Sequence, residues 1–337
     1  MRFVQTVQAA KKVQLDLYDR KILFSLSQNC RTSATQIGKR VGLSRDAVRY
    51  RIARLEKSGV IQGYRTIVDI NKFGYVIVHL LLQLNQPTSD AEKQLVEKFK
   101  GYSFCRAVIK FSGKYDFDLA LVARDMVELD GVITKIIADC GNYLQHYELL
   151  FITKPFAGKT FPNNFVKMPV EKSDKKSEKY VPDDFDIKLL DIIADKADLP
   201  LYHIGQKLGL SADAAKYRIR KLLNAGIIIG FVPVINYDVI GYNVYAILLN
   251  ISGLTPKRES TLAQFLSTNN DVLWAVKTIG KYNLLLYICT TDPDDLMKTT
   301  AALRSYFTES VRDFETLINY EEYKYTYWVN LSYLENK

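Results

Sequence analysis

The chain of 337 residues contains one long internal duplication. The sequence GLSRDAVRYRI at residues 42–52 returns as GLSADAAKYRI at residues 209–219, an offset of 167. The same offset aligns the GKY tripeptide at residues 113–115 with that at residues 280–282, with no net gap between. A unit of this length is a copy of whole domains and not a short solenoid repeat. We therefore expect two similar halves, each built from more than one module.

Three short helices are expected at the start of the first half. Residues 19–26 and 33–41 have helical spacing, and a third helix follows between Ser44 and Gly59. Gly42 suits a turn with positive φ, and the Ser44 hydroxyl can cap the first turn of the third helix. Gly59 is typical of the residue that follows a helix C-terminus. Three helices in this order are the pattern of a helix-turn-helix.

The third helix has one apolar face and one strongly basic face. Val48, Ile52 and Leu55 recur at i, i+4 and i+7 and form the apolar stripe, while arginines dominate the other face. The last helix of a helix-turn-helix enters the major groove of DNA, which this basic face suits. A solvated basic face without a ligand is the simpler alternative.

Each half continues with a module of strands and helices. Residues 60–69 predict a strand pair or wing, and residues 75–85 predict a strand buried on both faces. The order of the elements is β-α-β-β-α-β, which is that of a ferredoxin-like fold. The remaining elements of the first module are helices over residues 90–100 and 127–137 and strands over residues 105–111, 116–122 and 143–152.

The fold class is therefore α+β, with two copies of a helix-turn-helix followed by a ferredoxin-like module. Residues 154–183 contain three prolines and the charged run SDKKSEK, which is typical of a linker. Residues 321–333 alternate polar and aromatic side chains and predict an extra strand, with a platform for single-stranded bases as the alternative. The expected segments are a leader (1–14), a first helix-turn-helix (15–63), a first ferredoxin-like module (64–153), the linker (154–183), a second helix-turn-helix (184–230) and a second module with the strand extension (231–337).

The net charge and the cysteine content indicate which classes of function fit this chain. A net charge of +9 favours a polyanionic partner, which basic side chains bind through phosphate contacts. The four cysteines lie far apart without a CxxC pair, so free thiols in a reducing cytoplasm are expected and zinc or thioredoxin-like chemistry is not. No apolar run approaches the ~20 residues that span a bilayer, and the N-terminus lacks a signal-peptide pattern. We expect a cytoplasmic protein that uses no membrane, metal or cofactor.

Three stretches resemble the Lrp/AsnC family of prokaryotic transcriptional regulators. They are LDLYDRKIL at residues 15–23, IGKRVGLSRDAVRYRIARLEKSGVI at residues 37–61 and GKYD at residues 113–116. The family usually has one copy per chain, so a tandem is a departure that looks like a fused dimer. The resemblance implies a regulator that binds double-stranded DNA, associates through its ferredoxin-like modules and responds to a small effector, frequently an amino acid. Pairing of the two modules inside one chain, pairing between chains, or both fit the sequence.

The DNA contacts are expected on the polar face of the third helix in each half. An arginine there can pair with guanine O6 and N7, and Ser44 with the helix N-terminus can hold a phosphate. Arg51 lies beside the apolar stripe and can reach either a phosphate or an acid within the domain. The candidate residues are Ser44, Arg45, Asp46, Arg49, Tyr50, Arg51 and Arg54 in the first half, and Ser211, Asp213, Lys216, Tyr217, Arg218, Arg220 and Lys221 in the second.

The second copy of the basic helix differs in its charged side chains. Ala212 replaces Arg45, and Lys216 replaces Arg49. A lysine is a point charge and not a rigid fork, so it reads bases less specifically than an arginine. We expect both copies to touch DNA, with the first supplying more of the specificity and the operator being asymmetric. A mainly structural role for the second copy is the alternative.

The GKYD turn is the expected effector site. Its glycine lets the backbone approach a ligand, and its carboxylate can receive an ammonium group. A tight hairpin with an exposed acid is the alternative. The candidate residues are Gly113, Tyr115 and Asp116 in the first module and Gly280, Tyr282 and Asn283 in the second. Because Asn283 lacks the charge of Asp116, the second site is expected to be altered or silent.

Catalysis is the weaker functional alternative. Siroheme decarboxylases look similar to Lrp/AsnC regulators, but they need heme-contacting and proton-donating residues. The histidines His79, His146 and His203 are isolated in the sequence, and no Ser-His-Asp or HExxH pattern is present. A ligand sensor without base-specific contacts, or a chromatin-like protein that coats DNA, is the other alternative.

Overall fold

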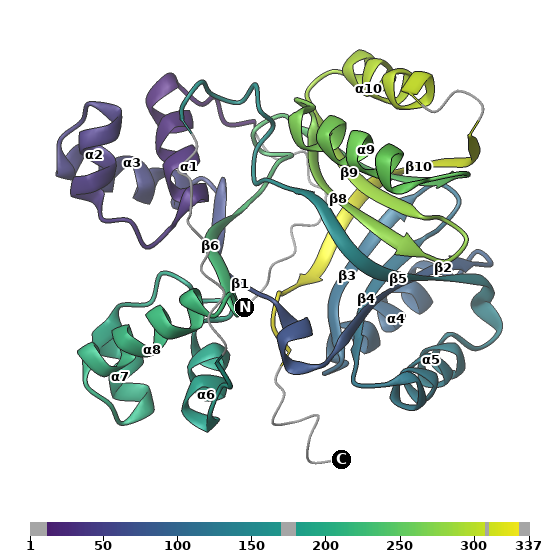
Figure 1. Cartoon of the computed structure of the whole chain (residues 1–337), viewed down its shortest axis with the longest axis horizontal. Coiled ribbons are helices and arrows are strands. Elements are labelled where there is room, and N and C mark those ends of the chain that lie inside the picture. Colours follow the sequence, from purple (N-terminus) through teal and green to yellow (C-terminus); the bar gives the residue numbers. More distant parts are fainter. Residues whose placement is uncertain (1–11, 170–179, 307–309, 330–337) are drawn as a thin grey trace. The chain divides into compact units, whose positions relative to one another are not determined.

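The computed structural model describes residues 12–169, 180–306 and 310–329, so most of the expected leader and the run SDKKSEK lie outside the described residues. The chain forms two compact units. We call residues 75–165 with 241–325 the barrel unit, and residues 12–74, 166–240 and 326–329 the helix-turn-helix unit. Each unit contains residues from both halves of the duplication (Figure 1).

The first helix-turn-helix consists of α1 (Leu17–Gln28), α2 (Ala34–Val41) and α3 (Arg45–Lys57). Each helix begins at a polar cap, because Asp16, Ser33 and Ser44 accept hydrogen bonds from free amides of the following turn. Gly42 ends α2 with a φ of 78°, in the left-handed region that favours glycine. The three expected helices are confirmed.

The second helix-turn-helix repeats this arrangement. It consists of α6 (Asp184–Ile193), α7 (Leu201–Leu208) and α8 (Ala212–Asn224). Ser211 caps α8 as Ser44 caps α3, and Gly209 ends α7 with a φ of 67°. The two halves differ at the start of the middle helix, since Ser33 caps α2 through its side chain and Pro200 before α7 makes no such bond.

The strand after each helix-turn-helix pairs with its own copy in the other half. β1 (Ile61–Val68) and β6 (Ile228–Ile235) form a two-stranded antiparallel sheet in which Arg65 lies opposite Val232. The sequence predicted a strand pair or wing within residues 60–69. A single strand forms there instead, and its hydrogen-bonding partner is β6 in the second half of the chain. A short helix, η1 (Ile70–Phe73), follows β1.

The barrel unit contains two β-α-β-β-α-β modules, as expected. In the first, β2 is buried from Val78 to Leu82, which confirms the prediction of a strand covered on both faces. The first module contains β2 (Val76–Leu84), α4 (Ser89–Gly101), β3 (Cys105–Ser112), β4 (Phe117–Ala123), α5 (Met126–Cys140), η2 (Gly141–Tyr143) and β5 (Leu144–Gly158). The second contains β7 (Asn243–Ile251), α9 (Pro256–Thr268), β8 (Val272–Ile279), β9 (Leu284–Thr290), α10 (Pro293–Tyr306) and β10 (Val311–Tyr325).

The two modules close into one barrel with the strand order β10-β3-β4-β2-β5-β8-β9-β7. Two seams join them, β5 with β8 and β10 with β3. The seams are equivalent under the 167-residue offset, since Phe151 lies opposite Ile279 and Ile318 lies opposite Ser112. The modules are thus paired inside one chain, by strand edges as well as by the packing of their inner faces.

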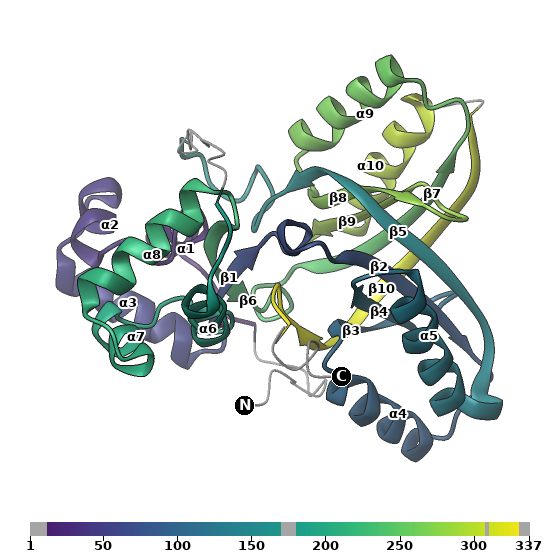
Figure 2. The same cartoon turned by 60° about the horizontal axis from the view of Figure 1, so that its bottom comes forward.

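Separate apolar clusters hold the barrel and its helices together. One cluster packs α4 and α5 against the outside of the first module, and a second packs α9 and α10 against the second module (Figure 2). A third fills the barrel interior with side chains from both modules, including Leu81, Leu248 and Leu317. All four cysteines are buried and free, which confirms that expectation.

The expected linker begins later than the sequence suggested. β5 continues to Gly158 because its last residues pair with β8. The next residues are also packed, with the rings of Phe161 and Phe165 stacked 4.0 Å apart and both buried. The C-terminal extension differs too, since residues 321–325 continue β10 and residues 326–329 form no strand, while residues 330–333 lie outside the described residues. None of the helices in the described part of the chain is long and apolar enough to cross a membrane.

Candidate nucleic-acid interface

The exposed face of α3 carries the side chains available to DNA. Val48 and Leu55 are buried beneath the helix, as the apolar stripe predicted. Arg45, Arg49 and Tyr50 are exposed on the opposite face, and Tyr50 keeps 71% of its surface accessible. Ser44 caps the helix through the Ala47 amide, and Asp46 lies 3.2 Å from the Arg45 Nε.

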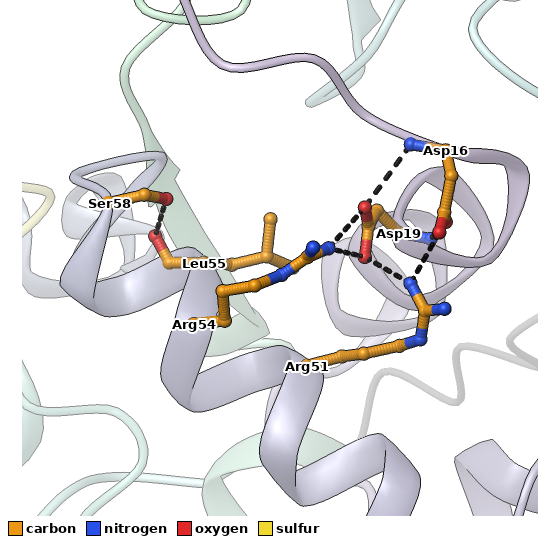
Figure 3. A network of polar contacts seen from close by, with 6 residues as sticks. All are labelled: Asp16, Asp19, Arg51, Arg54, Leu55 and Ser58. Atoms are coloured by element: carbon orange, nitrogen blue, oxygen red, sulfur yellow. Dashed lines mark hydrogen bonds and ion pairs between the residues drawn. The ribbon is translucent and has the colours of Figure 1, made fainter.

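Two arginines of α3 are held by acids of α1 (Figure 3). Arg51 donates to Asp16 Oδ2 at 2.7 Å and to Asp19 Oδ1 at 2.8 Å, and Arg54 donates to Asp19 Oδ1 at 2.6 Å. Asp19 is buried, with 1% of its surface accessible. A buried carboxylate needs such cationic partners, because it has lost its hydration. The network therefore fixes the basic helix against the first helix.

This network corrects part of the expected DNA contacts. Of the two roles open to Arg51, the structure shows the pairing with acids of the domain. Arg54, which was expected to read bases, is engaged by Asp19 although half of its side chain is exposed. Burial by itself would raise the pKa of Asp16, but hydrogen bonds from the Asp19 amide and Arg51 outweigh it and hold that pKa below its usual value.

In the second helix-turn-helix, the ion pairs of Arg51 have an equivalent, whereas those of Arg54 are replaced by other contacts. Arg218 donates to Asp183 Oδ1 at 2.8 Å and to the buried Asp186 Oδ1 at 2.9 Å, as Arg51 does in the first copy. Lys221 stands where Arg54 stands, and its ammonium lies over the Tyr180 and Tyr217 rings at 4.8 and 5.3 Å. Arg218 thus pairs with acids of its own domain, and its contact with DNA stays a prediction.

The exposed set of α8 differs from that of α3. The predicted DNA-contacting side chains that are exposed on α8 and its N-cap are Ser211, Asp213, Lys216, Tyr217 and Arg220. Arg220 has no basic counterpart in α3, where Ala53 stands at the equivalent position. The two helices therefore present different chemistry to a ligand.

The two helix-turn-helix modules are joined by reciprocal contacts. The Cys30 amide donates to the Phe231 carbonyl at 2.9 Å, and the Ala197 amide donates to the Tyr64 carbonyl at 3.1 Å. The two bonds are equivalent under the 167-residue offset, so the modules are related by pseudo-twofold symmetry, as in a C2 dimer. Together with the β1–β6 sheet, these contacts place α3 and α8 in one compact unit.

Comparison with known proteins agrees with this geometry. A family model described as winged helix-turn-helix DNA-binding matches residues 15–62 and 182–229. The chain is 34% identical over 123 residues to the HTH-type transcriptional regulator LrpA of Pyrococcus horikoshii, covering 36% of this chain and 86% of the relative. It is 32% identical over 126 residues to an uncharacterised HTH-type transcriptional regulator of Pyrococcus furiosus, covering 37% of this chain and 81% of the relative.

The chain belongs to the Lrp/AsnC family of transcriptional regulators. Within the family it is a tandem form, since the helix-turn-helix model matches twice. A crystal structure of the siroheme decarboxylase NirDL matches with a TM-score of 0.61, covering 94% of this chain and 99% of that chain. At 12% identity this likeness shows the fold alone. The sequence relatives are regulators, and the protein is a DNA-binding transcription regulator.

The expected effector residues of this Lrp/AsnC regulator lie at the junction of the two modules. Tyr115 and Tyr282 are fully buried, and their hydroxyl oxygens are 3.5 Å apart. A Cβ added to Gly113 would lie 2.8 Å from Leu317 Cδ2, so this glycine is required where β10 passes. A Cβ added to Gly280 would meet the backbone of β5. The turns are therefore part of the barrel closure.

The side chains of Asp116 and Asn283 each hold a neighbouring strand. Asp116 Oδ2 accepts from the Leu84 amide at 2.6 Å, and burial raises the pKa of this carboxyl. Asn283 makes the equivalent contact with Ile251 and adds a second hydrogen bond. Its side-chain oxygen accepts from the Ile251 amide, and its side-chain nitrogen donates to the Ile251 carbonyl. The structure thus shows a strand-fixing hydrogen bond at Asp116, whereas the hairpin alternative expected an exposed acid, and the ammonium contact stays a prediction.

The three histidines have separate environments in this regulator. His79 is buried in the barrel, where its Nδ1 lies 2.7 Å from Asp118 Oδ2. His146 is exposed on β5, and His203 is exposed on α7 beside the Tyr202 ring. Over residues 12–169, 180–306 and 310–329, no group of three His, Cys, Asp or Glu side chains is arranged to hold a metal ion.

Proposed function

We propose that the protein is a sequence-specific regulator that reads an asymmetric DNA site through α3 and α8 together. The observation that supports this proposal is the pairing of two unlike basic helices in one unit. Helix-turn-helix dimers read two half-sites whose spacing follows the spacing of their recognition helices. In this chain the recognition helices α3 and α8 differ, so the two DNA half-sites are expected to differ as well.

The first copy is proposed to supply more of the base specificity. Arg49 is exposed and its planar guanidinium matches the O6 and N7 acceptors of guanine. Lys216 at the equivalent position supplies a compact charge that suits a phosphate better than a base edge. Tyr50 and Tyr217 are the exposed aromatic neighbours in the two copies.

The test is selection of bound sequences from a random pool of double-stranded DNA at physiological salt. We expect the full chain to enrich one motif, Arg49→Ala to relax one half of it, and Lys216→Ala to weaken binding with little change of motif. Lys93→Ala in the barrel unit is the matched control, because it removes one exposed lysine elsewhere. No enriched motif, with binding that fades uniformly with salt, indicates a DNA-coating protein or a ligand sensor instead.

We further propose that a small effector regulates the DNA affinity. The proposal rests on the family resemblance and on the closure of both modules into one barrel, which gives an effector a single site to stabilise or distort. Because the relatives by sequence are regulators, we propose no enzymatic activity for this protein. We propose that it acts in the cytoplasm, where it meets DNA. Adding the effector is expected to change the DNA dissociation constant without changing the selected motif.

A further inference from the structure

The surface that joins the two helix-turn-helix modules is not symmetric in its side chains. On one side of the pseudo-twofold axis, Arg65 of β1 lies 3.8 Å from Asp195, which follows α6. The 167-residue offset places Val232 and Gln28 at the equivalent positions on the other side, and these side chains form no ion pair because neither is charged. The Arg65 side chain is buried, and a buried guanidinium needs an acidic partner because it has lost its hydration.

Thr66 adds two hydrogen bonds that its counterpart cannot make. The Thr66 amide donates to the Ala194 carbonyl at 2.8 Å, and the Thr66 hydroxyl donates to the Ile193 carbonyl at 2.7 Å. The equivalent residue of the second half is Pro233, which has neither an amide hydrogen nor a hydroxyl group. Two second halves paired in the same arrangement would therefore leave the carbonyl groups at the end of α6 without these donors.

A third difference lies in the loops that meet across the axis. Arg31 donates to the Ala197 carbonyl at 2.6 Å, and its guanidinium lies over the Phe231 ring, 5.5 Å from the centroid. The offset makes Asp198 the counterpart of Arg31, so Arg31 is bonded to the residue next to its own counterpart and both positions lie near the axis. A pair of two first halves would bring two guanidinium groups together there, and a pair of two second halves would bring two carboxylates together. Like charges repel, whereas the observed pair combines opposite charges.

One seam of the barrel shows a similar difference. At the β5–β8 seam, Lys154 of the first half contacts Glu259 of α9, which also accepts from Lys277 at 2.5 Å. At the β10–β3 seam, Glu321 stands where Lys154 stands, and Glu92 stands where Glu259 stands. Two paired second halves would have two acids and one lysine at both seams, and Glu259 would lose the contact with Lys154.

We propose that these side chains make pairing selective, so that each half accepts a half of the other kind and rejects a copy of itself. The partner that fits the first half is the second half of this chain, or of another copy of it. The one-sided contacts within the helix-turn-helix unit disfavour both like pairs, and the β5–β8 seam disfavours the pair of two second halves. The duplication therefore encodes a pair of unlike halves and not a linked homodimer. This selectivity depends neither on the proposed DNA site nor on an effector.

The test breaks the chain within residues 170–179 and co-expresses the two fragments, residues 1–174 and 175–337, so that the whole protein is present. Each fragment is supplied in excess in turn, and native mass spectrometry counts the fragments in every two-fragment species. We expect mixed pairs in at least about tenfold excess over like pairs, since each like pair loses several contacts. Like pairs at comparable abundance, or no pair of either kind, overturn the proposal.

Variants of the first fragment test the assignment to these residues. Gln28→Asp supplies an acid where Asp195 stands in the second half, and Arg31→Ala removes the charge near the axis. The double variant is expected to raise the share of first-fragment pairs by about threefold or more. Its mixed pair with the second fragment shows that it is folded, and Gln28→Asp alone provides the test where that pair is lost. Gln94→Asp changes an exposed residue of α4 and is the matched control. An unchanged share in the variants, or an equal rise in the control, overturns the assignment.

Discussion

At the scale of single residues, ion pairs with buried acids hold several basic side chains of α3 and α8. Asp19 and Asp186 occupy equivalent positions and are both buried. Each takes an arginine from the last helix of its module, Arg51 in one copy and Arg218 in the other. Arg51 is paired with these acids while Arg49 is exposed, although the two are neighbours on one helix.

Replacing Asp19 with alanine is expected to destabilise the helix-turn-helix unit by about 2–3 kcal/mol. The substitution leaves Arg51 and Arg54 without their buried partner, and the loss of one member of such a network costs more than a surface pair contributes. Urea unfolding followed by circular dichroism measures the change. Asp46→Ala removes an exposed acid of α3 and is expected to change stability by less than about 0.5 kcal/mol. Equal effects of the two substitutions contradict the prediction.

Stability is also expected to fall when the pH is lowered below about 4. Hydrogen bonds with Arg51 and Arg218 overcome the effect of burial and hold the pKa of Asp16 and Asp183 below the ordinary value of 3.8. The unfolded chain then takes up protons first, so this contribution is complete above the unfolded pKa and is lost as pH falls through the folded pKa. Unfolding between pH 6 and 2.5 measures it. The Asp16→Asn/Asp183→Asn variant is expected to show a shallower loss, and an identical slope refutes the assignment.

At the scale of secondary-structure elements, two glycine turns make room for the strands that join the modules. A Cβ at Gly280 would lie 2.2 Å from the Leu149 carbonyl oxygen, and one at Gly113 would collide with β10. A side chain at Gly280 requires movement of the neighbouring strand, whereas at Gly113 the nearest atom belongs to the Leu317 side chain. The GKY turn was identified in the sequence as a place where backbone approaches a ligand. In the structure the neighbour is a strand of the other module.

Gly280→Ala is expected to destabilise the barrel unit by about 3 kcal/mol or more, because the contact is with backbone and cannot be relieved by a rotamer change. Amide hydrogen exchange is expected to increase most along the β5–β8 seam. Gly131→Ala is the matched control, since the added Cβ on α5 meets nothing within 4 Å and alanine favours a helix. Unchanged exchange along the seam in Gly280→Ala argues against the role of this turn.

The sequence predicted the elements well and their long-range partners poorly. Helices such as α3 depend on a cap at Ser44 and apolar spacing within a few residues, so their signals are local. The partner of β1 is β6, and no local pattern in residues 60–69 distinguishes a wing from a strand that pairs with its copy.

Dependence on long-range contacts also explains which features of the site and of β5 the sequence did not predict. Asp19 and Asp186 occupy equivalent positions of the duplication, but their pairing with Arg51 and Arg218 depends on how the first helix of each module crosses the third. The extension of β5 to Gly158 was missed because Pro155 was taken as a sign of a linker. A sheet tolerates proline where a strand is irregular, and the β5–β8 pairing shifts register at this residue.

At the scale of the whole molecule, the duplication produces two pseudo-symmetric assemblies from one chain. The helix-turn-helix unit and the barrel unit each combine one part of both halves. A symmetric dimer must carry the same substitution on both sides of its axis. In this chain His79 and Asp118 form a buried pair, whereas Ala246 and Leu285 occupy the equivalent positions. The two halves have therefore become chemically different while keeping the same fold.

Inserting five base pairs between the two half-sites of the selected operator is expected to reduce affinity to about that of one half-site. The insertion rotates one half-site by about half a turn of DNA, and α3 and α8 belong to one compact unit that cannot follow it. Electrophoretic mobility shift or fluorescence anisotropy measures the change. A control operator changes the same positions without changing their number. Unaltered affinity after the insertion contradicts a fixed pair of reading helices.

The closed barrel has a consequence for a cell that contains several related regulators. Its eight strands bond to one another in a complete ring, so the ring offers no free strand edge to a related subunit. Family members that pair between chains can exchange subunits with paralogues and form mixed species. Here the partner of each module is encoded in the same gene, so the composition of the pair does not change with the abundance of its relatives.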